Sequence, residues 1–171
     1  MRRWGLIAAG IATLLLLWAM SPMEERMQAN GVGIVTFELS GGQDRADEIL
    51  AEWGEEGRDA AREQLWIDYA FMLAYGTFLA LACAAVRDLC RNRNLRRLTR
   101  AGTIAIWLGP LAAGFDALEN ACLLLTVDEA GAAFPLLATI FAACKFALLA
   151  AAIAYLLAGI VGALANRVST A

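Results

Sequence analysis

The chain has 171 residues, 60% of them hydrophobic, and its mean hydropathy is +0.58; soluble domains contain about 45–50% apolar residues, so the excess must be buried in something other than the protein's own core. The absence of histidine excludes bis-imidazole haem ligation, histidine-rich metal sites and nucleophiles paired with histidine. With 17 acidic and 14 basic residues the net charge is −3, which argues against a nucleic-acid partner. We therefore expect a membrane protein that binds lipids and needs no cofactor or metal.

Four apolar runs have about the 20 residues that a helix needs to cross about 30 Å of hydrocarbon. They cover residues 4–21, 65–87, 101–126 and 134–165. This pattern predicts an all-α membrane protein, a single domain built as a bundle of four transmembrane helices. The first run could instead be a cleavable signal peptide, but Pro22 would then begin the mature chain, a position where signal peptidase tolerates proline poorly. We expect an uncleaved helix.

The charges between the spans predict the orientation of the chain. Residues 21–64 include eleven acids and four arginines, whereas residues 87–100 include six arginines and one aspartate. Basic residues favour the cytoplasmic side, and Arg2, Arg3 and Arg167 lie on the same side as 87–100. We therefore expect a bacterial inner-membrane protein with both termini in the cytoplasm. The arginine-rich segment could also bind anionic lipid headgroups.

Residues 21–64 form the one sizeable extracytoplasmic loop, which is too short and polar to bury a core of its own. Apolar residues recur every three or four positions in its second half: Ala46, Ile49, Leu50, Trp53 and Gly57. This spacing predicts an amphipathic helix that rests on the bundle as a lid. Before it, residues 37–39 are expected to be extended across the outer mouth, with Glu38 as a candidate lid contact. A solvated loop without specific contacts is the alternative.

Tryptophans at the span ends agree with the predicted boundaries, because their rings prefer the headgroup layer. Trp4, Trp18 and Trp66 occupy such positions. Trp107, several residues inside the third span, does not. The four cysteines form no CxxC motif, so we expect packing residues and no thiol oxidoreductase.

Ionisable side chains occur inside the spans, although each costs about 2.5–3.5 kcal/mol at the bilayer centre on insertion scales. On the third span Asp116, Glu119 and Asn120 share one face through their i, i+3, i+4 spacing. At about 1.5 Å of rise per residue, Asp116 and Lys145 lie at the same depth, roughly 15 Å from the outer surface. We expect a polar pocket in the outer half of the bundle, lined by Asp68, Tyr75, Asp116, Glu119, Asn120 and Lys145.

The charges of this pocket do not balance. One lysine faces three acids in the spans, so at least one carboxyl must be protonated, hydrated or matched by a group from outside the chain. This favours a pocket that binds a lipid or a lipophilic or cationic small molecule. A network that only fixes helix register is one alternative. An accessory subunit, whose polar residues meet a protein partner within the membrane, is another.

Catalysis is a further alternative. An acid/base enzyme acting on a lipid could use a protonated carboxyl together with Tyr75, but no spacing in the chain specifies a reaction. No catalytic residue is assigned, and we lean against an enzyme.

Three short segments carry a resemblance: FEL at 37–39, DYAFMLAYG at 68–76 and DALEN at 116–120. They resemble a group of small, uncharacterised bacterial membrane proteins with four helices. In that group F-E-L precedes a second span opening D-x-x-F-x-x-x-Y and a third span containing D-x-x-E-N. The likeness covers most of the chain after the first helix. It implies no reaction, but it points to the following residues: Glu38, Asp68, Tyr75, Asp116, Glu119 and Asn120.

Overall fold

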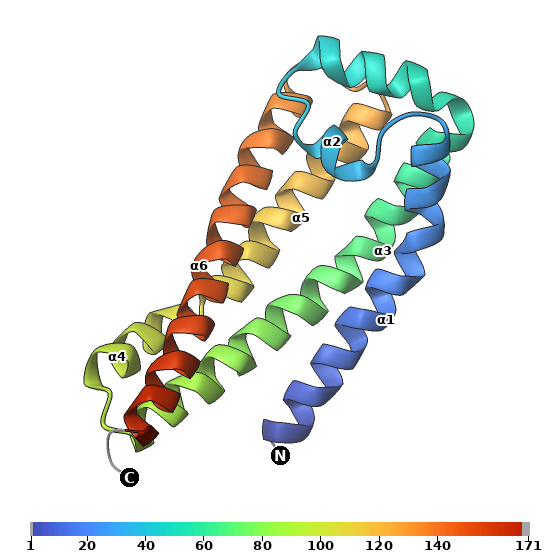
Figure 1. Cartoon of the computed structure of the whole chain (residues 1–171). Helices are drawn as coiled ribbons and strands as arrows, with labels where there is room; N and C mark the ends of the chain where they lie inside the picture. The colour runs from blue at the N-terminus through green and yellow to red at the C-terminus, as the bar shows by residue number, and fades with distance from the viewer. Residues whose placement is uncertain (1, 169–171) are drawn as a thin grey trace.

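The computed structural model of the protein describes the backbone of residues 2–168 and the side chains of residues 3–166. Its elements are α1 (Arg2–Ala29), α2 (Ile34–Glu38), α3 (Gln43–Asn92), α4 (Arg96–Ala105), α5 (Leu108–Val127) and α6 (Phe134–Val168) (Figure 1). Within this part of the chain there is no strand, and four helical segments are long and apolar enough to cross a membrane. The expected all-helical, multi-pass architecture is confirmed. The side chains of Arg2 and Arg167, used in the charge comparison, lie outside the described residues.

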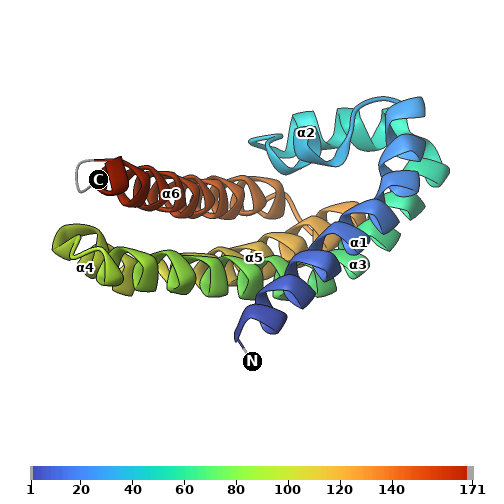
Figure 2. The same ribbon diagram turned by 60° about the horizontal axis from the view of Figure 1, so that its bottom comes forward.

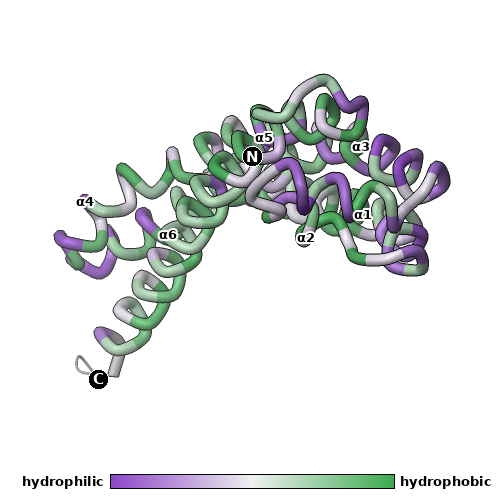
Figure 3. The backbone as a smooth tube through the Cα atoms, turned by 90° about the horizontal axis from the view of Figure 1, so that it is seen from above, coloured by the Kyte–Doolittle hydropathy of each residue, from purple (hydrophilic) through white to green (hydrophobic). Residues whose placement is uncertain are grey.

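The long helices form a bundle that is open along one side. Helix α5 packs against α3 and α6, whereas α1 lies along α3 and makes little contact with α6 in the described residues (Figures 1 and 2). Large apolar side chains such as Leu14, Leu73 and Leu157 remain exposed, as lipid-facing residues must be. Figure 3 shows the hydrophilic residues gathered near α2 and near α4, at the two ends of the apolar bundle.

Helix α3 bends sharply at Gly54, where φ is 58° and ψ is −160°. Only glycine adopts this backbone conformation readily. Residues 43–53 consequently lie across one end of the bundle, while the rest of α3 runs along it (Figure 1). The five residues that the spacing predicted to face the bundle are buried: Ala46, Ile49, Leu50, Trp53 and Gly57. Ala51, which lies off that face, is exposed.

Helix α2 replaces the extended segment expected at residues 37–39. A lone extended strand would leave its backbone groups without partners at this buried position, whereas a helical turn pairs them locally; Leu39 N–H, for example, donates to the Val35 carbonyl at 3.2 Å. Phe37 is buried against Trp53, with ring centroids 4.8 Å apart. The helix therefore sits beneath residues 43–53, between that segment and the bundle interior.

The third span is not one continuous helix over 101–126. It is interrupted at Ile106 and Trp107, between α4 and α5, although both residues keep right-handed helical backbone angles. Pro110 has no N–H to donate to the Ile106 carbonyl, so it is tolerated only in the first turn of a new helix. This break explains the position of Trp107, whose ring is exposed at the junction of two helices.

Helices α3 and α5 approach closely at two glycines. A Cβ on Gly109 would lie 2.7 Å from the Gly76 carbonyl oxygen, and one on Gly76 would lie 3.1 Å from the Ala113 Cβ. Small residues allow this backbone contact. Because α5 carries Asp116, Glu119 and Asn120, the contact sets how near those side chains come to α3.

Candidate functional site

Lys145 of α6 lies at the centre of a cluster of carboxyl groups. Its Nζ is 3.1 Å from Asp116 Oδ1, 2.8 Å from Glu119 Oε2 and 3.4 Å from Glu38 Oε2. The Tyr75 hydroxyl donates to Asp116 Oδ2 at 2.7 Å. All five side chains are buried. An ammonium group has three N–H donors, and here three carboxyl groups surround it.

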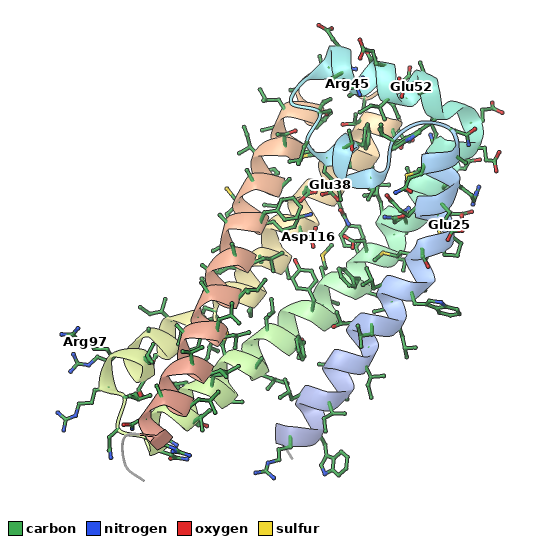
Figure 4. All side chains as sticks on the ribbon, viewed as in Figure 1. Glu25, Glu38, Arg45, Glu52, Arg97 and Asp116 are labelled. Atoms are coloured by element: carbon green, nitrogen blue, oxygen red, sulfur yellow. The ribbon has the colours of Figure 1, made fainter. Side chains whose placement is uncertain are left out.

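Four elements supply this cluster. Asp116 and Glu119 project from one face of α5, Lys145 comes from α6 and Tyr75 from α3. Helix α2 brings Glu38 down from the end of the bundle, and Figure 4 shows Glu38 and Asp116 facing each other. In the same view Arg45 and Arg97 point away from the bundle.

Glu38 is thus buried and reaches Lys145 in the interior of the bundle. The Thr139 hydroxyl donates to the Glu38 carbonyl at 2.8 Å and accepts from Gly41 N–H at 3.0 Å, which ties the end of α2 to α6. Burial raises the pKa of the Glu38 carboxyl above its ordinary value of 4.5, and Lys145 only partly opposes this effect.

Asp68 and Asn120 form a second polar pair beside this cluster. The Asn120 amide donates to Asp68 Oδ2 at 2.7 Å and to the Leu65 carbonyl at 3.3 Å. Asp68 makes no ion pair within the described part of the chain. The structure thus brings all six residues of the expected polar pocket together, but as two groups: one around Lys145, and one in which Asp68 has an amide as its partner.

A cavity of about 390 Å³ adjoins both groups. Its polar lining comprises Glu38, Gln64, Asp68, Tyr75, Asp116 and Lys145. Its apolar lining includes Leu17 and Met20 of α1 and the rings of Phe71, Phe78 and Phe146. Residues of α1 and of α6 both line the cavity, although these two helices make little contact with each other among the described residues.

Gln64 is a pocket residue that the sequence interpretation placed in the loop. Helix α3 continues through this position, so Gln64 lies one helical turn before Asp68 on the same face. The spacing of four residues between the two polar side chains was the signal that could have identified it. Its Oε1 is buried and has no hydrogen-bond partner among the described residues.

All four cysteine thiols are free. Three of them are buried: Cys83, Cys90 and Cys122. Cys90 Sγ lies 3.7 Å from the Gly159 carbonyl oxygen. Within the described residues no set of three cysteine, aspartate or glutamate side chains is arranged to hold a metal ion.

Comparison of the chain with protein-family models, curated proteins and solved structures finds no match. The geometry of the site is therefore the basis for a functional proposal.

Proposed function

We propose that this protein binds a lipophilic cation, such as an amphiphilic amine or a lipid with a basic headgroup, in the cavity beside Asp68 and Asp116. The observation that carries the proposal is the excess of carboxyl groups over ammonium groups in and directly beside a cavity whose remaining walls are mostly apolar. Four carboxyls, on Glu38, Asp68, Asp116 and Glu119, accompany the single ammonium of Lys145.

The protein's own groups leave part of this negative charge unmatched. Lys145 is fully engaged by three carboxyl groups, and the Tyr75 hydroxyl donates to one of them. An unpaired charge is costly in a medium of low dielectric constant. A bound cation near Asp68 would supply the missing charge without displacing a protein contact.

The walls of the cavity suit the apolar part of such a ligand. Ligand sites are commonly about 300–1,000 Å³ and mostly apolar, with a few polar groups that fix orientation. Here about 390 Å³ is bordered by leucines, a methionine and three phenylalanine rings. Aromatic faces also attract cations, by about 0.5–2 kcal/mol depending on desolvation. The open side of the bundle would admit the ligand from the bilayer.

The proposal includes a location. The arginines of residues 87–100 support a cytoplasmic position for the α4 end, with both termini on that side and α2 on the extracytoplasmic side. Residues 43–53 would then act as the lid over the cavity. The resemblance of the three short segments to small bacterial proteins supports the inner membrane as the site.

A thermal-shift experiment tests the proposal. The purified protein in nanodiscs of zwitterionic lipid is heated with dodecylammonium or with dodecanol, which has the same chain and no charge. A ligand at 100 times its Kd stabilises a protein by about 2.7 kcal/mol, so dodecylammonium should raise the melting temperature and dodecanol should not.

The variants for this experiment are Asp116→Asn and Asp68→Asn, with Asp128→Asn as control. Asp128 is a surface carboxylate paired with Arg62 at 3.0 Å, outside the cavity. The first two variants should lose most of the shift and the control should keep it. Equal shifts with the amine and the alcohol would mean that the carboxyl groups play no part in binding, and the proposal would be abandoned.

A further inference from the structure

We infer that Gln64 and Asp68 together recognise the N–H groups of a protonated amine, so that the pocket selects amines that carry N–H donors over quaternary ammonium groups. This inference rests on the proposed function and names the class of ligand more narrowly. Two observations carry it: the buried Oε1 of Gln64 has no hydrogen-bond partner among the described residues, and Gln64 lines the same cavity as Asp68, whose carboxyl makes no ion pair there.

The first observation is the state of Gln64. Its relative exposure is only 8%, its side chain lines the cavity, and Oε1 has no hydrogen-bond partner among the described residues. Buried polar groups in folded proteins nearly always have partners. A terminal amide turns about a broad torsion, so the Gln64 carbonyl can be directed into the cavity without moving the helix.

The second observation is the state of Asp68. One of its oxygens, Oδ2, accepts from Asn120, and no ammonium or guanidinium group of the described residues pairs with the carboxyl. The side chain is half-buried at the wall of the cavity. Residues four apart on a helix have Cβ atoms about 5–6 Å from each other, so the two acceptors of Gln64 and Asp68 can bind the same headgroup.

With the Gln64 amide turned in this way, the pair would present acceptor oxygens to the cavity. A primary ammonium offers three N–H donors, one for the carboxylate and one for the amide oxygen. A trimethylammonium group offers none, and it would leave Oε1 of Gln64 without a partner. Sites that hydrogen-bond a ligand group reject analogues lacking it far more strongly than they reject a change in apolar size.

The apolar lining places the rest of the ligand. Leu17 and Met20 of α1 and Phe71 and Phe78 of α3 border the same cavity. A hydrocarbon tail in this position would lie against α1, with the headgroup at α3.

The experiment compares dodecylammonium with dodecyltrimethylammonium in nanodiscs of zwitterionic lipid, with apparent affinities taken from thermal-shift titrations of the tryptophan emission. The wild-type protein should bind the primary amine at least tenfold more tightly. Gln64→Leu should reduce that preference to near unity, through loss of affinity for the primary amine. Asp68→Asn should weaken binding of both cations.

Gln43→Leu is the matched control. Gln43 is also on α3 and its Oε1 also lacks a partner, but it does not line the cavity. This variant should keep the wild-type preference. Gln64→Leu should melt, without ligand, at or above the wild-type temperature, because leucine removes a buried unpaired polar group.

Three results would overturn the inference. If wild-type protein binds the two cations equally, and both better than dodecanol, the pocket binds cations but does not read N–H groups. If Gln64→Leu keeps the tenfold preference, Gln64 takes no part in recognition. If neither cation binds better than dodecanol, the proposed function fails and this inference fails with it.

Discussion

Replacing Lys145 with methionine tests whether the carboxyl groups depend on this one cation. The side chains are similar in length, so the change removes the charge and little volume. In the native protein three carboxyl groups lie within 3.4 Å of Nζ. Without the ammonium they would face one another in a buried site.

The size of the effect follows from these distances. At an effective dielectric constant of about 20, a charge pair about 3 Å apart attracts by roughly 5 kcal/mol, much of which offsets desolvation. Breaking a buried pair by removing one partner typically costs about 3–5 kcal/mol. In a chain of this length, a loss of about 1 kcal/mol in unfolding free energy lowers the melting temperature by roughly 2–4 °C. Lys145→Met should therefore lower the melting temperature by about 6–20 °C.

The assay is thermal unfolding of the purified protein in detergent, followed by circular dichroism at 222 nm. Arg62→Met is the control, since Arg62 pairs with Asp128 at 3.0 Å on the surface. Such exposed pairs contribute about 0–1 kcal/mol. Combining Lys145→Met with Asp116→Asn and Glu119→Gln should recover part of the lost stability, because the repelling charges are then gone.

The reasoning would be refuted if Lys145→Met and Arg62→Met lowered the melting temperature by the same small amount. It would also be refuted if the combined variant were less stable than Lys145→Met alone. Either result would mean that charge in the cluster is not what stabilises this part of the bundle.

Three further predictions concern the bend at Gly54, the α3–α5 contact and the carboxyl of Glu38. Gly54→Ala should cost about 1–3 kcal/mol in unfolding free energy through backbone strain alone, since an added Cβ meets no atom within 4 Å. Gly114→Ala is the control, because Gly114 is equally open but has no positive φ, and this variant should be neutral or slightly stabilising in the same thermal unfolding experiment. Equal effects of the two variants would contradict the bend at Gly54. Gly109→Ala should cost about 1–3 kcal/mol by overpacking against Gly76, measured in parallel with Gly114→Ala. Because the folded-state pKa of Glu38 is raised, the contribution of this carboxyl to stability is fully present below its unfolded pKa and is lost as pH rises through the folded pKa. Glu38→Gln should therefore reduce the fall in melting temperature that the wild-type protein shows above pH 4.5. Parallel curves of melting temperature against pH for the two proteins would contradict the raised pKa.

Local features of the sequence were sufficient to predict the four apolar helices and the similar depth of Asp116 and Lys145 along their helices. The length and hydropathy of an apolar run determine whether it can cross a bilayer, and helical rise then relates Asp116 on one span to Lys145 on the next. The contact of 3.1 Å between these two residues agrees with that estimate. The spacing from Ala46 to Gly57 likewise identified side chains that the structure buries.

Only the tertiary structure shows which helices contact one another and which side chains they bring together. That α2 is helical and carries Glu38 to Lys145 depends on Phe37 packing against Trp53, a contact between segments that no periodicity relates. The open side of the bundle, beside the cavity at Gln64, reflects that α1 packs on α3 and makes little contact with α6 among the described residues. Hydrophobic length and helical period are properties of a segment alone, whereas a cavity and its unpartnered groups are properties of the space between segments.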